Sequence, residues 1–230
     1  RPEMTGGAGR QDITARSAVL RVKGSRFMTQ GRRIKCSGFA EFNSEPVAII
    51  GMSGQMPQSR NLDEFWRNLE DGRSLITEIP GGRWDWETAG EAGADEDISK
   101  LGGFLNEIDK FDPLFFSISP KEAEMMDPQQ RLFMETVWKT IEDAGYKASD
   151  LSGTRTGVFV GVATSDYYDL LREYNPEIQL QTSTGISHAM LANRISYLLN
   201  LKGPSEPVDT ACSSSLVAIH RAVEAIQLGN

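Results

Sequence analysis

The chain has 230 residues, of which 39% are hydrophobic and 24% are charged, and its formal net charge is −8. This composition is typical of a soluble globular protein with one sizeable core or two small ones, and it excludes collagen-like, coiled-coil and disulfide-rich chains. The longest apolar runs fall far short of the roughly 20 residues needed to cross a bilayer. No association with a membrane is therefore expected.

The few cysteines and histidines limit the metal and redox chemistry. Cys36, Cys212, His188 and His220 show no zinc-binding spacing, and two cysteines cannot form a disulfide framework. We therefore expect no metal site and a reducing, cytoplasmic location. The negative net charge also argues against a nucleic-acid partner, because phosphate contacts need clustered Lys and Arg.

The charge is unevenly distributed along the chain. Residues 1–40 hold nine Lys and Arg against two Asp and Glu, a net charge of +7, whereas residues 41–230 carry −15. The N-terminal segment is polar, contains glycine and lacks periodicity, which predicts a basic linker or irregular arm over residues 1–44 and a folded domain over residues 45–230. A transit peptide and a basic docking arm are alternatives. Because the chain opens on Arg1 rather than Met, we expect it to be part of something longer.

The folded part is predicted to begin with a strand and a helix. PVAIIGMSG, residues 46–54, predicts a strand buried on both faces, as in a parallel sheet. A capping box at Asn61 predicts a helix that Gly72 ends. Its apolar stripe is Leu62, Phe65, Trp66 and Leu69. Residues 73–110 predict a long ordered loop in which RWDW supplies aromatic anchors.

Two helix starts follow in succession. Ser119 and Asp127 each precede a proline at the first helical position, which predicts one helix after each of them. Gly145 ends the second helix. The wide apolar stripe of that helix is Phe133, Met134, Val137, Trp138 and Ile141.

The C-terminal part alternates between predicted strands and helices. We expect strands over residues 156–163 and 205–210, and helices over residues 165–174, 187–199 and 213–229. In the second of these helices, Ala189 and Ala192 are expected to allow close packing; the stripe of the last is Leu216, Ile219, Val223 and Ile226. Such alternation indicates α/β layering.

Cys212 lies where the last strand passes into the last helix, within the stretch VDTACSSSLVAIH. The unpaired amides and the dipole at a helix N-terminus favour a thiolate, which is a nucleophile. The same amides can stabilise the negative oxygen that forms when the thiolate attacks a carbonyl or thioester. The alternative is that Cys212 is a small buried hydrophobe, as free cysteines commonly are, in a non-catalytic interaction scaffold.

VDTACSSSLVAIH resembles the active-site signature of β-ketoacyl synthases, specifically the ketosynthase domains of modular polyketide synthases. The resemblance covers about residues 45–230 and includes EPVAIIGMSGQMP, DPQQR, GVFVG and SYLLNLKGPS in the family's order. RWDW with GGFLNEIDKFDPLFF is similar to ketosynthases that work with separate acyltransferases. The resemblance implies an α/β, thiolase-like layered fold, of which this chain is the N-terminal half.

By this resemblance, Cys212 accepts an acyl chain from the phosphopantetheine arm of an acyl carrier protein. A carbanion made by decarboxylation of a malonyl unit then attacks the acyl-enzyme, and the β-ketoacyl product is two carbons longer. The resemblance implies no bound cofactor, a carrier-protein partner and a homodimer of the full unit. An acidic carrier surface would be attracted to the +7 arm.

The family uses two further histidines, in HGTGT-like and KSNIGH-like motifs, and neither motif is among these 230 residues. His188 and His220 match neither position and are expected to be packed or surface residues. We therefore expect the chain to be inactive in condensation alone and to need a complementing C-terminal half on the same or a second chain. An excised fragment and a decayed domain kept for structure are alternatives. A chalcone-synthase-like or thiolase-like condensing enzyme is a further alternative, disfavoured by DPQQR and TACSSS.

Overall fold

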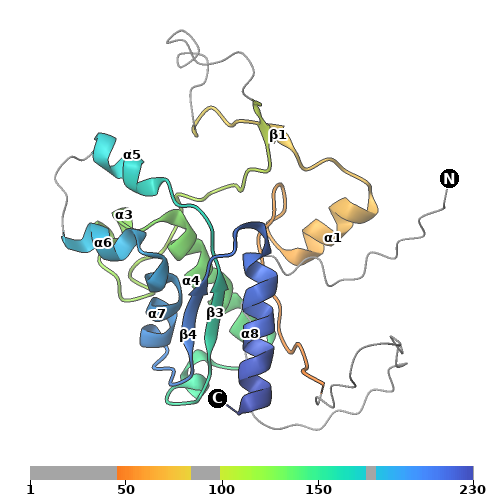
Figure 1. Cartoon of the computed structure of the whole chain (residues 1–230). Coiled ribbons are helices and arrows are strands. Elements are labelled where there is room, and N and C mark those ends of the chain that lie inside the picture. The colour runs from red at the N-terminus through yellow and green to blue at the C-terminus, as the bar shows by residue number, and fades with distance from the viewer. Residues whose placement is uncertain (1–45, 84–98, 175–179, 230) are drawn as a thin grey trace.

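The computed structural model describes residues 46–83, 99–174 and 180–229, and Figure 1 shows how they are arranged. The predicted arm over residues 1–44, Cys36 and the two tryptophans of RWDW lie outside these ranges. The helices are α1 (Leu62–Glu70), α3 (Pro120–Glu124), α4 (Pro128–Asp143), α5 (Tyr167–Tyr174), α6 (Leu180–Ile186), α7 (His188–Leu198) and α8 (Ser214–Leu228). The strands are β1 (Thr77–Glu78), β2 (Leu101–Gly102), β3 (Val158–Gly161) and β4 (Ser205–Val208), and 3₁₀ turns span Ala148–Leu151 and Ala211–Ser213.

The centre of the fold is the parallel pair of strands β3 and β4. Val158 lies opposite Ser205, and Gly161 lies opposite Val208. Helices α5, α6 and α7 form the connection between the two strands, as a parallel pair requires. In Figure 1, α7 and α8 flank the pair on opposite sides, and both helices contact both strands. This arrangement confirms the predicted α/β layering.

The two faces of β3 have different partners, because successive side chains of a strand point to opposite sides. One face enters the main core together with buried side chains of α4 and α7. The core residues are Val158, Val160 and Val162 of this face, Met134, Val137 and Ile141 of α4, and Leu191, Ala192, Ile195 and Leu199 from α7 and its end, with others around them. The other face of β3 presents Gly161 to α8.

Helix α8 begins and ends where predicted, but it packs through a different face. Its buried residues are Ser214, Ala218 and Ala222, one turn apart, whereas Leu216 of the predicted stripe is 63% exposed. A Cβ built on Gly161 would lie 2.6 Å from the Cα of Ser215, so the helix backbone lies directly against the strand. Only small side chains fit in so narrow a space, and therefore the larger apolar residues do not form the buried face.

The two helix starts at Ser119 and Asp127 are confirmed. The Ser119 hydroxyl accepts a hydrogen bond from the backbone N–H of Glu122 at 3.2 Å, and the Asp127 carboxylate accepts one from that of Gln129 at 2.8 Å. Each cap satisfies a backbone donor that would otherwise lack a partner. Gly145, just after α4, has a φ of +77°, which glycine adopts without strain. Helix α7 is also confirmed, with Ala192 fully buried but Ala189 exposed.

The strand predicted for residues 46–54 is not formed. These residues belong to no strand in the described part of the chain, and the side chains of Ile49 and Ile50 are 68% and 40% exposed. A strand needs a neighbour for its backbone groups, and none of the described strands pairs with this segment. Instead it lies against α4, where the N–H of Met52 donates to the Asp143 carboxylate at 2.8 Å.

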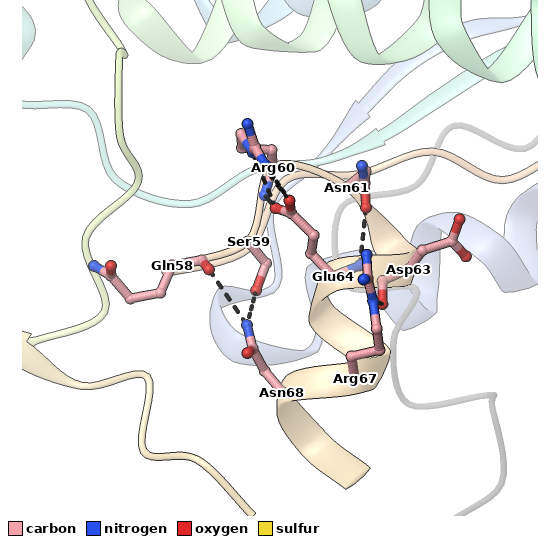
Figure 2. Close-up of polar contacts among 8 residues, drawn as sticks. All are labelled: Gln58, Ser59, Arg60, Asn61, Asp63, Glu64, Arg67 and Asn68. Atoms are coloured by element: carbon pink, nitrogen blue, oxygen red, sulfur yellow. Dashed lines mark hydrogen bonds and ion pairs between the residues drawn. The ribbon is translucent and has the colours of Figure 1, made fainter. Parts of the chain in front are cut away.

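Helix α1 is confirmed, but its capping box is shifted by one residue. Figure 2 shows the Asn61 side chain accepting from the N–H of Glu64 at 2.9 Å, as predicted. The Glu64 carboxylate accepts from the N–H of Arg60 at 2.8 Å and pairs with the Arg60 guanidinium, and does not reach back to Asn61. No residue of α1 is buried among the described residues. The predicted loop after α1 contains the short antiparallel pair of β1 and β2.

Candidate active site

Cys212 lies at the edge of the sheet where the parallel strands β3 and β4 both end. The two strands are still joined just beyond that edge, because the N–H of Val162 donates to the carbonyl of Val208 at 3.0 Å. From Val208 the chain turns through residues 209–213 into α8, as the blue segment at the top of α8 shows in Figure 1. The carboxyl edge of parallel strands is the usual place for ligands in α/β folds.

The thiol of Cys212 is open to solvent. Residues 209–213 are all exposed, and Cys212 is an exposed free cysteine. Free cysteine is among the residue types most often buried, so exposure in an ordered turn is unusual. The described part of the chain therefore does not use Cys212 as a packing residue.

The turn around Cys212 has an uncommon backbone shape. Ala211 has a φ of +55°, in the left-handed region that costs a residue with a Cβ roughly 1–2 kcal/mol. Side chains on both sides hold this shape: the Asp209 carboxylate accepts from the N–H of Ala211 at 3.1 Å, and the Ser213 hydroxyl donates to the carbonyl of Thr210 at 2.8 Å. The conformation of the turn is thus fixed by several contacts around Cys212.

The electrostatics of the turn come from α8. This helix has 15 residues and no acidic side chain in its first turn, and its N-cap residue Ser213 provides no side-chain cap. The positive end of the helix dipole therefore faces the turn without a neutralising carboxylate in the first turn of the helix. A negative charge on the Cys212 sulfur, or on an oxygen bonded next to it, would be stabilised there.

The loop that leaves β3 at the same edge is tied to the start of α4. The Gln129 side chain donates to the carbonyl of Thr164 at 3.1 Å, and the Ser165 hydroxyl donates to the Asp127 carboxylate. Asp127 is buried, and its carboxylate both caps α4 and holds the loop. Sequence reasoning identified Asp127 only as a helix cap, because no local pattern shows which distant loop a cap will meet.

Gln130 makes a second link, which sequence reasoning missed. Its buried side-chain amide donates to the carbonyl of Gly185 at 2.8 Å and accepts from Nε of Arg194 at 2.9 Å. Arg194 in turn pairs with Glu122 at 2.6 Å. These bonds join α3, α4, α6 and α7. The available signal in the sequence was the position of Gln130, a polar residue one turn before Met134 of the apolar stripe of α4.

The two histidines are not part of the turn. His188 is the first residue of α7 and is half-buried. His220 is exposed on α8, and its Nε2 lies 3.5 Å from the carboxylate of Glu224. His220 follows Cys212 by eight residues, which is roughly 12 Å along a helix. Both positions agree with the expectation of packed or surface histidines.

The described ranges hold neither of two other kinds of site, a metal-binding cluster or a membrane-spanning helix. Within them, the His, Cys, Asp and Glu side chains form no group of three or more placed to hold a metal ion. None of the helices in these ranges has the length and hydrophobicity of a membrane-spanning segment.

Comparison with known proteins gives the family. The family described as "Beta-ketoacyl synthase, N-terminal domain" matches residues 44–230. The polyketide synthase PksN of Bacillus subtilis is 48% identical over 217 residues, which is 91% of this chain and 4% of the relative. The polyketide synthase ThaG of Burkholderia thailandensis is 47% identical over 189 residues, covering 81% and 3% of the two chains.

Solved structures give the same result for the fold. A ketosynthase from module 6 of the bacillaene synthase of Bacillus subtilis aligns with a TM-score of 0.64 at 44% identity, over 76% of this chain and 27% of that one. An oxazolomycin ketosynthase domain of Streptomyces albus aligns with a TM-score of 0.68 at 42% identity, over 78% and 32%. The predicted thiolase-like layered fold is thereby confirmed. This chain spans a small part of each relative, and it belongs to the β-ketoacyl synthase family through the N-terminal domain of that family.

Proposed function

We propose that this chain carries the acyl-accepting cysteine of a ketosynthase in polyketide chain elongation. The Cys212 thiolate attacks the carbonyl of an acyl thioester on the phosphopantetheine of an acyl carrier protein. A new S–C bond forms, the bond to the phosphopantetheine sulfur breaks, and the released thiolate takes up a proton. The observation that carries the proposal is an exposed cysteine in an ordered turn before the N-terminus of α8, in a chain of this family.

The chemistry of the turn supports this first half-reaction. The dipole of α8 favours the thiolate as the attacking species and also the oxyanion that develops on the thioester carbonyl. The exposed residues 209–213 leave room for an acyl chain and a phosphopantetheine arm to approach. The step needs no bound cofactor, because the phosphopantetheine arrives with its carrier.

The second half-reaction needs groups that these 230 residues do not contain. Decarboxylation of a malonyl unit produces a carbanion, and the HGTGT-like and KSNIGH-like histidine motifs implied by the resemblance are absent. We propose that a complementing C-terminal half, on the same or a second chain, supplies them and that the full unit is a homodimer. The carbanion attacks the acyl group on Cys212, the S–C bond breaks, and the Cys212 thiolate is restored.

Site-resolved labelling tests the proposed nucleophile. The chain is incubated with acetyl-N-acetylcysteamine, a thioester that mimics acyl-phosphopantetheine, and the acetylated residue is found by mass spectrometry. We expect acetylation at Cys212 in the native chain and in a Cys36→Ser variant, and none at this position in Cys212→Ser. Labelling at Cys36 alone, with Cys212 unreactive even beside the complementing half, would favour a non-catalytic scaffold.

A further inference from the structure

The hydroxyl of Ser214 spans the turn that presents Cys212. It accepts a hydrogen bond from the N–H of Thr210 at 2.8 Å and donates one to the carbonyl of Ala211 at 2.6 Å. These two backbone groups precede Cys212, whereas Ser214 follows it, so the two bonds close a small ring around the cysteine. The ring includes Ala211, the residue with the left-handed backbone.

We propose that Ser214 is a positioning residue for acyl transfer, which clamps the turn so that Cys212 is held in a reactive geometry. This inference rests on the proposed function of Cys212 as the acyl acceptor. Ser214 itself does not touch the substrate in this proposal. Its hydroxyl acts through the Thr210–Ala211 backbone, whose direction decides where the sulfur of Cys212 lies relative to the start of α8.

Ser214 is suited to this role because it cannot move easily. Its side chain is buried, with 5% of the residue exposed, and it is the first residue of α8. The helix is pinned at this point, since a Cβ on Gly161 would lie 2.8 Å from the carbonyl carbon of Ser214. The clamp therefore joins an exposed turn to a helix start that is held against the sheet.

The two hydrogen bonds of Ser214 are needed because Ala211 has a left-handed backbone conformation. An alanine leaves this region unless surrounding contacts hold it there. Without the Ser214 hydroxyl, the remaining side-chain contacts to the turn come from Asp209 and Ser213, both on the exposed side. We expect the turn to sample other shapes, and Cys212 to lose its place before the N-terminus of α8 while staying exposed.

Two reagents distinguish the alignment of the Cys212 thiol from its exposure to solvent. Alkylation by iodoacetamide needs only an accessible thiolate, whereas acetylation by acetyl-N-acetylcysteamine also needs the developing oxyanion to meet the amides. Misplacement of a reacting group by about 1 Å can cost on the order of 100-fold in rate. We therefore expect Ser214→Ala to lower the acetylation rate of Cys212 about 10- to 100-fold and its alkylation rate less than about threefold.

Ser215→Ala is the matched control. Ser215 lies in the same helical turn, is half-buried, and its hydroxyl takes part in none of the hydrogen bonds found among the described residues. Both rates should stay at the native level in this variant. A purely structural role for Ser214 would lower acetylation and alkylation together, or leave both unchanged, and either result would overturn the proposal.

The native chain provides a measurement that does not depend on the folding of any variant. The N–H of Thr210 should exchange with solvent deuterium much more slowly than an unprotected amide, because the Ser214 hydroxyl accepts its hydrogen bond. Exchange at the unprotected rate would show that the clamp is absent. If the native chain takes no acetyl group, the proposed function of Cys212 fails, and the exchange rate of the Thr210 N–H still decides whether Ser214 holds the turn.

Discussion

Gly161 sets the distance between β3 and α8, and its replacement by alanine should move the helix that begins beside Cys212. The added Cβ would lie 2.6 Å from both the Cα and the backbone nitrogen of Ser215. Ordinary van der Waals contacts of a Cβ begin at 3.4 Å. These are backbone atoms, which cannot rotate away as the end of a side chain can. The start of α8 must therefore shift by roughly 0.8 Å in Gly161→Ala to reach ordinary contact.

The energetic cost follows from the packing of α8. Ala218 and Ala222 are also buried, and α8 packs against both β3 and β4, so a shift of the helix start also opens gaps along the helix. Overpacking of a tight contact typically costs about 1–3 kcal/mol in the free energy of unfolding. For a chain of this size, that corresponds to a fall of about 2–12 °C in Tm.

Urea or thermal unfolding followed by circular dichroism measures this loss, and acetylation of Cys212 measures the displacement. We expect Gly161→Ala to lower both the free energy of unfolding and, by about tenfold or more, the acetylation rate. Gly81→Ala is the control, because a Cβ at Gly81 meets nothing within 4 Å, and its stability should stay within about 0.5 kcal/mol of the native value. Native stability and native acetylation in Gly161→Ala would refute the close contact.

Two further predictions concern polar contacts away from Cys212. Gln130→Leu should lower the free energy of unfolding by about 1–3 kcal/mol in urea, because the Nε of the half-buried Arg194 loses its acceptor; a change below about 0.5 kcal/mol would contradict this. Hydrogen bonding from Arg60 lowers the pKa of Glu64 from 4.5 to about 2, so the stabilisation from this pair is complete above about pH 4.5 and is lost as the pH falls through about 2. A carboxyl titration by NMR should show this midpoint, which should return toward 4.5 in Arg60→Gln; equal midpoints would contradict the pairing.

The helix starts of this chain could be predicted because capping is local. Ser119 and Asp127 each bond to a backbone N–H two or three residues ahead, so a short sequence window contains both partners. Gly145 stops α4 for an equally local reason, its φ of +77°. The strand β3 could also be predicted, because the apolar run that marks it, GVFVGVA, lies within one short window of the sequence.

Features that depend on distant partners were mispredicted or missed. Residues 46–54 have the composition of a buried strand, but a strand forms only beside another strand, and none of those described pairs with them. The buried face of α8 was assigned from apolar periodicity to the Leu216 stripe, whereas the contact with Gly161 requires the small residues. Periodicity finds the most hydrophobic face of a helix, and the size of the facing residue decides which face packs.

The position of Cys212 was predictable, whereas the way it is held was not. A strand followed by small residues and a helix predicts a turn at the cysteine, and the structure places it there. The bonds from Ser214 to Thr210 and Ala211 depend on the left-handed φ of Ala211, and nothing in an alanine signals that conformation. In the sequence, the run of serines indicates only that the side chains are small. The hydrogen bonds of Ser214 become evident only from the conformation of the turn.

Gly161 and Ser214 act on the same start of α8 by different physical means. Gly161 acts by size from the strand side, and its effect needs no hydrogen bond. Ser214 acts by two hydrogen bonds from the turn side, and Ser214→Ala adds no volume and leaves the contact with the strand intact. If acetylation falls in Gly161→Ala but not in Ser214→Ala, placement of the helix alone prepares Cys212. If acetylation falls in both variants, the turn needs both the helix in place and the hydrogen bonds of Ser214. Because Gly161 and Ser214 act on the same helix start, their effects should be less than additive in the double variant.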